Sequence, residues 1–254
     1  MNILEVDHLD HSFGGLHAVD NVSFGLEKGM IKAIIGPNGA GKTTLFNLIS
    51  GVIPPSSGKV YFCGEDITGL FPFQIAKRGM IRTFQSPRLS EHMTVLENVM
   101  IGRHIRSHSG FVSSILKLPS ARKEEKSIRE EALKALEALD IADYKDKEVS
   151  SLPFGIQRSV EFARALACEP SLLLLDEPAS GLNMVETKEL AKLIHRIREN
   201  GITVLLVEHD MGLVMDISDE IVVLNFGKKI AEDKPHAIRR NSEVIKIYLG
   251  DEDA

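Results

Sequence analysis

Residues 36–43 of the chain read Gly36-Pro37-Asn38-Gly39-Ala40-Gly41-Lys42-Thr43, and Thr44 follows them. The run fits G-x-x-x-x-G-K-[ST], in which glycines let backbone N–H groups converge on phosphate oxygens without a Cβ in the way. An apolar run over 30–35 precedes the glycines, and a helix-forming stretch over 43–49 follows them. Since a phosphate-binding loop requires strand, glycine loop and helix in that order, the segment predicts a site for a nucleoside triphosphate.

The side chains of this loop have separate expected roles. The helix that begins near Lys42 presents its positive N-terminal end to anions. We expect the Lys42 ammonium to reach the β- and γ-phosphates and the Thr43 hydroxyl to ligate Mg²⁺. The loop as a whole, residues 36–44, is therefore expected to bind ATP, with Thr43 belonging also to the metal site.

Two acidic residues follow a continuous apolar run, in Leu172-Leu173-Leu174-Leu175-Asp176-Glu177. Such a run is typical of a parallel strand that is buried on both faces. Ligands of parallel sheets bind at the carboxyl ends of the strands, so both acids are expected beside the phosphate loop. We expect Asp176 to hold Mg²⁺ through water and Glu177 to polarise the attacking water as general base. Either acid alone could simply cap a strand, but the phosphate loop favours hydrolysis.

Three further motifs occur in a definite order along the chain. They are Arg82-Thr83-Phe84-Gln85, Ala179-Ser180-Gly181-Leu182-Asn183 and Val207-Glu208-His209-Asp210. With the phosphate loop and the acidic pair, they resemble the ATP-binding subunits of ABC transporters over essentially the whole chain. The resemblance implies that Gln85 touches Mg²⁺ and the γ-phosphate, and that His209 contacts the γ-phosphate and the attacking water. It also implies that residues 179–183 form the family's D-loop.

Phe13 lies in His11-Ser12-Phe13-Gly14-Gly15. The resemblance places it where the family usually has an aromatic ring that stacks on adenine. Phenylalanine retains the π-face that stacking requires. The alternative is a phenylalanine that packs in a small β core.

The resemblance implies an α/β fold, with a P-loop NTPase core, an antiparallel β subdomain and an inserted helical subdomain of the ABC ATPase type. Short extended runs are predicted at 3–6 and 22–26, and a helix at 184–199. Helical patterns at 94–103 and 122–139 have no strong strand pattern between them. We expect one ABC ATP-binding domain over residues 1–254, made of a core with its β subdomain at 1–87 plus 161–254 and a helical subdomain at 88–160.

The signature sequence departs from the family's usual Leu-Ser-Gly-Gly-Gln, because it reads Leu152-Pro153-Phe154-Gly155-Ile156. Proline is tolerated in a first helical turn, where we expect Pro153, and Ser151 could cap the helix. The family geometry implies that the Gly155 amide faces the γ-phosphate of an ATP held by the opposite subunit. The lost serine hydroxyl removes a hydrogen bond to a charged group, worth about 1.5–3 kcal/mol, so weaker ATP-driven dimerisation is predicted.

The composition limits the classes of partner that the chain is expected to bind. Net charge is -6, which argues against a general nucleic-acid binder. No secretory signal is apparent, and no apolar run approaches the roughly 18 to 20 residues that span a bilayer. The resemblance implies two kinds of partner, a second ATP-binding subunit, identical or paralogous, and integral membrane transporter subunits. We expect a cytoplasmic protein that is peripheral on the inner face of the cell membrane through those subunits, with no nucleic acid bound.

Local stretches sharpen the resemblance toward importers of branched-chain and other hydrophobic amino acids. They are Phe13-Gly14-Gly15-Leu16, the run Met93-Thr94-Val95-Leu96-Glu97-Asn98-Val99, the extended segment 103–123 and Ile247-Tyr248-Leu249-Gly250. A urea or amide importer and a lipopolysaccharide-export subunit remain alternatives. A soluble ABC ATPase that acts on ribosomes or DNA is opposed by the single cassette and the absence of a long coiled coil or basic arm. A nucleotide binder without turnover is opposed by Glu177 and His209.

Overall fold

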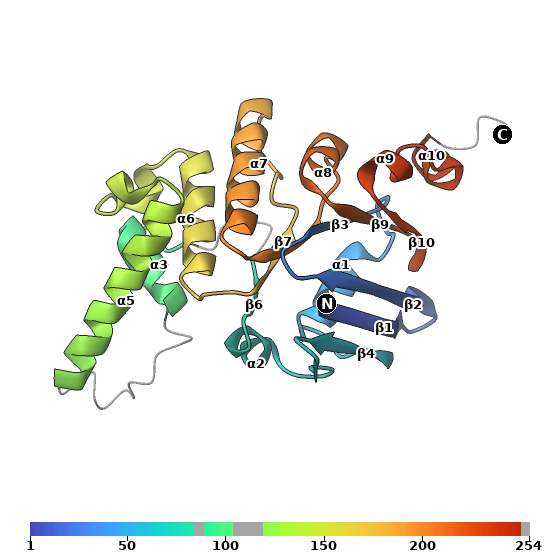
Figure 1. Cartoon of the computed structure of the whole chain (residues 1–254), viewed down its shortest axis with the longest axis horizontal. Coiled ribbons are helices and arrows are strands. Elements are labelled where there is room, and N and C mark those ends of the chain that lie inside the picture. Colours follow the sequence, from blue (N-terminus) through green and yellow to red (C-terminus); the bar gives the residue numbers. More distant parts are fainter. Residues whose placement is uncertain (84–88, 104–118, 250–254) are drawn as a thin grey trace. The chain divides into compact units, whose positions relative to one another are not determined.

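The computed structural model describes residues 1–83, 89–103 and 119–249 (Figure 1). The chain forms two compact units, Met1–Gln85 with Ser171–Ala254, and Ser86–Pro170. The chain thus leaves the first unit once and returns to it. The second unit ends at Pro170, about ten residues beyond the end expected for the helical subdomain at 160. The reason is that helix α6 (Phe154–Leu166) packs against α3 (Val95–Arg103) within the second unit.

The first unit contains an antiparallel sheet of four strands in the order β2-β1-β4-β5. The strands are β1 (Asn2–Phe13), β2 (Leu16–Glu27), β4 (Ser57–Phe62) and β5 (Glu65–Asp66). Both N-terminal strands are longer than the short runs predicted at 3–6 and 22–26. Register shifts along β1, one of them between Val6 and Leu9, interrupt the apolar alternation on which the prediction depends, so the sequence pattern underestimates their length.

A second sheet has the order β10-β9-β3-β8-β7-β6. Its strands are β3 (Ile31–Ile35), β6 (Met80–Arg82), β7 (Leu172–Asp176), β8 (Thr203–Val207), β9 (Glu220–Asn225) and β10 (Lys228–Asp233). Only the edge strand β10 pairs antiparallel, and the other five run parallel. Every residue of β3 and β8 is buried, which is why both strands are apolar apart from Lys32 and Thr203.

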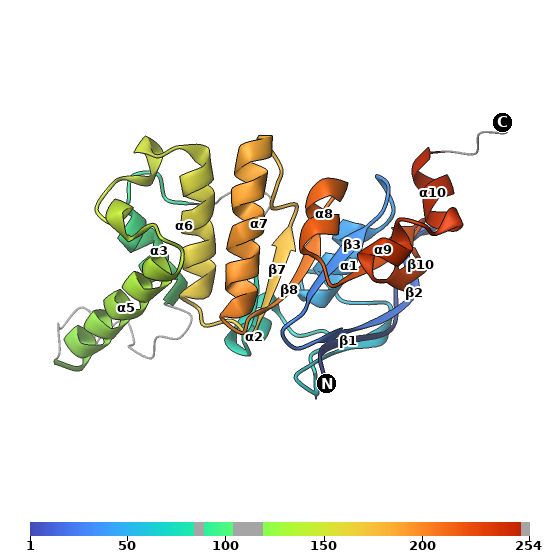
Figure 2. The ribbon, with the colours of Figure 1, turned by 45° about the horizontal axis from the view of Figure 1, so that its top comes forward.

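Helices cover both faces of this second sheet. They are α1 (Lys42–Ile49), α2 (Pro72–Lys77), α7 (Met184–Glu199), α8 (Met211–Ile217), α9 (Pro235–Ile238) and α10 (Ser242–Leu249). Figures 1 and 2 show α1 on one side of the parallel strands and α7 and α8 on the other. Helix α7 has the predicted bounds. Asn183 Oδ1 accepts the N–H groups of Val185 and Glu186 at its first turn, which is the capping signal that fixes this start.

The main core of the first unit lies between the two sheets, with α1 inside it. Phe46 and Leu45 of α1 are fully buried and join apolar side chains of both sheets. Strands β7, β8 and β9 each contribute alternate residues to this cluster, as in Leu172 and Leu174 of β7. The helix that follows the phosphate loop is therefore packed between the two sheets.

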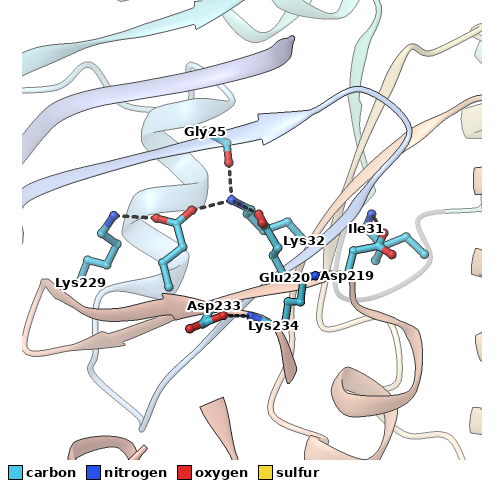
Figure 3. Close-up of polar contacts among 9 residues, drawn as sticks. Gly25, Ile31, Lys32, Asp219, Glu220, Lys229, Asp233 and Lys234 are labelled. Carbon is cyan, nitrogen blue, oxygen red and sulfur yellow. Dashed lines mark hydrogen bonds and ion pairs between the residues drawn. The ribbon is translucent and has the colours of Figure 1, made fainter. Parts of the chain in front are cut away.

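One cation lies within this packing (Figure 3). Lys32 of β3 is 1% exposed, and its Nζ donates to the Gly25 carbonyl of β2. The same ammonium lies 2.5 Å from Glu232 Oε1 and 2.9 Å from Glu220 Oε2, while Lys229 Nζ donates to Glu232 Oε2 at 2.7 Å. Burial raises the pKa of Glu232, but hydrogen bonds from Lys229 and Lys32 outweigh it and leave that pKa below its ordinary value. The ion pairs lie within the second sheet, and the Lys32 hydrogen bond to the Gly25 carbonyl joins them to the first sheet.

The second unit is helical in its described part. It contains α3, α5 (Pro119–Ala138), α6 and the short turns Ala142–Tyr144 and Val149–Ser151. Helix α3 begins with a capping box, in which Thr94 Oγ1 accepts the Glu97 N–H at 3.2 Å and Glu97 Oε2 accepts the Thr94 N–H at 2.8 Å. Helix α5 has an apolar face that is buried at Ile128, Ala132 and Leu136. None of the helices that the structure describes is long and apolar enough to cross a bilayer.

Candidate nucleotide site

The loop between β3 and α1 adopts a backbone that only glycine serves well. Gly41 has φ +97°, and a Cβ on it would collide with the carbonyl oxygen of Ala18 on β2. At Gly39, with φ +81°, an added Cβ would meet no atom within 4 Å, and Asn38 and Gly39 are both exposed. The loop is therefore pressed against the antiparallel sheet on one side and open on the other, as a cradle for phosphate groups must be.

Lys42 places its charge inside this loop. Its Nζ donates to the carbonyls of Gly36 at 2.7 Å and Pro37 at 2.9 Å, and the side chain is 8% exposed. Burial lowers the pKa of the Lys42 ammonium, and the negative charge of Glu177 acts in the opposite direction. Thr43, the next residue, is exposed at the start of α1. The predicted phosphate and metal ligands of the loop thus lie at one helix N-terminus.

Asp176 ends β7 and contacts a partner from the neighbouring strand β6. The Arg82 Nη2 lies 2.7 Å from Asp176 Oδ2, and the two side chains are only 13% and 14% exposed. Arg82 Nη1 donates to Asn47 Oδ1 and to Ser50 Oγ, both at 2.8 Å. Its guanidinium carbon lies 5.5 Å from the centre of the Phe46 ring. Asp176 is thereby tied to the helix that follows the phosphate loop.

Arg82 is a site residue that the motifs did not single out. The available signal was an arginine on an otherwise apolar strand, Met80-Ile81-Arg82, three residues before Gln85. A charged side chain that is mostly buried requires a counter-ion. The sequence alone does not show that the counter-ion comes from Asp176, 94 residues further along the chain.

Glu177 follows β7 in an unusual backbone conformation. Its φ is +46°, a left-handed value that is uncommon for a residue with a Cβ. Its N–H donates to the Val207 carbonyl at 2.9 Å, which holds the turn. The side chain is 25% exposed, and its Oε2 lies 3.9 Å from Nδ1 of His209. The two residues of the predicted hydrolytic pair therefore meet at the carboxyl ends of β7 and β8.

The other expected site residues have separate positions. Phe13 ends β1 with 53% of its surface exposed, and its ring lies edge-to-face with that of His11, at 4.5 Å between centroids. The alternative of a core phenylalanine is therefore wrong. Gln85 lies outside the described residues. Gly155 lies in the first turn of α6, within the second unit.

The start of α6 differs from the expectation in two ways. Pro153 is the N-cap residue, with φ −56° and ψ 149°, so it precedes the first helical turn. Ser151 does not cap the helix, because its Oγ donates to the Glu148 carbonyl at 2.7 Å. The reason is the short turn Val149–Ser151, which turns the Ser151 side chain back on its own segment.

Comparison with known proteins agrees with this geometry. Residues 19–180 match the family model described as "ABC transporter", and residues 228–254 match the model described as "Branched-chain amino acid ATP-binding cassette transporter". The chain is 44% identical over 250 residues to the high-affinity branched-chain amino acid transport ATP-binding proteins BraF of Pseudomonas aeruginosa and LivG of Escherichia coli. In each comparison the match covers 98% of both chains.

Solved structures show the same fold. The ADP conformation of an ATP-binding cassette of an ABC transporter is 34% identical, with a TM-score of 0.86, and the match covers 98% of this chain and 99% of that one. A nucleotide-free ATP-binding cassette is also 34% identical, with a TM-score of 0.85. The expected fold class is thereby confirmed, and the chain belongs to the ABC transporter family as an ATP-binding cassette.

Proposed function

We propose that this chain is the ATP-hydrolysing subunit of an importer for branched-chain or other hydrophobic amino acids. The observation that carries the proposal is the 44% identity to BraF and LivG across 98% of each chain. The match at residues 228–254 to a model described for branched-chain amino acid transporters agrees with it. A catalytic domain shared by all cassettes would not by itself favour that substrate class.

In the proposed ATP complex, the backbone amides of residues 36–44 and the Lys42 ammonium bind the phosphates. The ring of Phe13 stacks on the adenine, since 53% of this residue's surface is exposed at the end of β1. The oxygen donors of Thr43 and Asp176 fit Mg²⁺, a hard cation that proteins hold through one or two oxygen ligands together with substrate phosphates. When bound, Mg²⁺ would neutralise charge that develops on the phosphates. Gln85 is the third proposed ligand.

The proposed hydrolytic step is carried by Glu177 and His209. Glu177 accepts the proton of the attacking water, because its carboxylate is partly open to solvent beside the phosphate loop. His209, 62% exposed and 3.9 Å from that carboxylate, holds the water and the γ-phosphate in line. Gln85 completes this set from the segment after β6.

We further propose that the chain works in an assembly. The Gly155 amide at the start of α6 meets the γ-phosphate held by a second ATP-binding subunit, identical or paralogous. Integral membrane subunits hold both ATPases on the cytoplasmic face of the membrane. A nucleic-acid partner is not expected, since the chain is acidic overall.

The transport function is tested with the complete assembly. The tagged chain should purify from solubilised membranes with two integral membrane subunits, and this complex, placed in vesicles with its binding protein, should import labelled leucine only when ATP is inside. Excess isoleucine should compete, and urea should not. Import of urea without import of leucine would show that the substrate is urea or an amide and not a hydrophobic amino acid. Recovery with ribosomes or DNA in place of membrane subunits would overturn the transport role.

The altered signature gives a separate prediction. Pro153→Ser should strengthen ATP-driven dimerisation by about 10- to 100-fold, because a serine hydroxyl at the N-cap position supplies a charged hydrogen bond worth about 1.5–3 kcal/mol. Sedimentation with ATP in a hydrolysis-deficient background measures the dimer constant. Pro153→Ala is the matched control, since it removes the proline without adding the hydroxyl. An equal gain in both variants, or none in either, would show that the hydroxyl is not the missing contact.

A further inference from the structure

Glu208 is the most deeply buried carboxylate near the site, and no expected role accounts for it. It lies between the last residue of β8 and His209, and its surface is 0% exposed. A buried carboxylate costs several kcal/mol in desolvation unless it is well compensated. An uncharged residue would therefore be the cheaper way to fill this position if packing were its only purpose.

Backbone N–H groups supply the compensation. Glu208 Oε1 accepts the N–H of Ala179 at 2.7 Å. Its other oxygen, Oε2, accepts the N–H of His209 at 2.8 Å and that of Asp210 at 3.2 Å. Hydrogen bonds to an ionised acceptor are stronger than neutral ones, so three of them hold this carboxylate firmly.

The donors belong to two separate loops. Ala179 lies in the D-loop segment 179–183 after β7, whereas His209 and Asp210 follow β8. The parallel ladder between these strands ends with Asp176 beside Val207, after which Glu177 N donates to the Val207 carbonyl. Beyond that point, the Glu208 carboxylate links the segment that follows β7 to the segment that follows β8.

The bridged loops carry the two groups of the hydrolytic pair. Glu177 lies two residues before Ala179, and its Oε2 is 3.9 Å from His209 Nδ1. That same Nδ1 lies 3.7 Å from Glu208 Oε2. On the far side, Asp210 Oδ1 accepts the Leu213 N–H at 3.0 Å, which anchors the second loop to α8. The loop after β8 is thus attached to α8.

We propose that Glu208 is a positioning residue that couples the D-loop to the segment carrying His209, so that Glu177 and His209 reach their working separation together. The inference rests on the proposed ATPase function. It implies that a shift of either loop is transmitted to the other through one carboxylate, because both amide sets bind the same group.

The first test is Glu208→Gln, which preserves the shape of the side chain. An amide keeps one acceptor oxygen and turns an NH₂ group toward backbone donors, so one loop loses its partner. We expect kcat for ATP to fall about 10- to 100-fold, while KM and the equilibrium affinity for ATP change less than twofold. Glu208→Asp keeps the charge but is too short for both loops, and it should give a similar loss of kcat.

Asp219→Asn is the matched control for an anchoring carboxylate. Asp219 Oδ2 accepts the Ile31 N–H at 2.8 Å at the opposite ends of the strands, away from the phosphate loop. We expect this control to lower the thermal midpoint and to leave kcat unchanged. A Glu208→Gln protein with wild-type kcat would overturn the inference, as would a loss of kcat that matches only the loss of folded protein. A wild-type chain without ATPase activity would instead contradict the proposed function.

A double-substitution cycle gives the second test. If Glu208 acts through His209, adding Glu208→Gln to His209→Ala should lower kcat by less than twofold more, because the group to be positioned is already absent. Amide hydrogen exchange should accelerate in both 177–183 and 208–212 in the Glu208→Asp protein. Multiplicative losses of kcat together with faster exchange in one loop only would show that the carboxylate does not couple them.

Discussion

Replacement of Glu177 with glutamine is expected to lower the turnover number for ATP by about 10²- to 10⁴-fold, with ATP binding retained. The amide has the same shape but cannot accept the proton of the attacking water. Lys42 and the loop amides, which we propose bind the phosphates, keep their sequence and backbone in this variant. Phosphate release measured at saturating ATP gives the loss of turnover, and equilibrium binding of a fluorescent ATP analogue checks that affinity is kept.

The same variant should accumulate as an ATP-bound dimer, since hydrolysis is the step that is blocked. Glu189→Gln is a suitable control, because Glu189 lies on the exposed face of α7, where its Oε1 pairs with Lys192 Nζ at 2.8 Å. That control should hydrolyse ATP at the wild-type rate. Unchanged turnover in Glu177→Gln would remove Glu177 as the general base.

Lys32→Met is expected to lower the free energy of unfolding by about 3 kcal/mol near pH 7. The methionine fills the space of the lysine stem but leaves Glu220 and Glu232 facing each other and the Gly25 carbonyl without its donor. The value lies at the low end for a broken buried pair, because both carboxylates keep some contact with water, at 33% and 24% exposure. Urea unfolding followed by circular dichroism measures it.

The fall of the unfolding free energy at acid pH gives a second check on the Lys32 network. Burial raises the pKa of Glu232, but hydrogen bonds from Lys229 and Lys32 lower it overall, so its folded-state pKa lies below the unfolded value of about 4.3. The resulting stabilisation is fully present above the unfolded pKa and is lost as the pH falls through the folded one. Lys32→Met should lose less stability over that range than the wild type. Lys32→Met with Glu220→Gln and Glu232→Gln should recover part of the loss, and a single-variant change below 1 kcal/mol would contradict the network's role.

The local chemistry of this chain is readable from its sequence because it depends on neighbours within a few residues. The glycines of 36–41 predict the turn between strand and helix, since the positive φ values they adopt exclude a side chain. Asn183 with Glu186, three residues later, predicts the start of α7. The same locality explains the errors, because the register shifts in β1 and the turn at Val149–Ser151 interrupt the patterns that were extrapolated.

What the sequence by itself determined is the kind of site, an ATP-binding loop followed by an acidic pair and a histidine at strand ends. Only the tertiary structure decided which groups support them: Arg82 against Asp176, Glu208 against Ala179, and Lys32 against Glu232. The first two pairs join neighbouring strands or loops, the third joins β3 to β10 with β9 between them, and the partners lie 29 to 200 residues apart along the chain. The physical reason is that periodicity and turn chemistry act locally, whereas the partner of a buried charge is chosen by strand order.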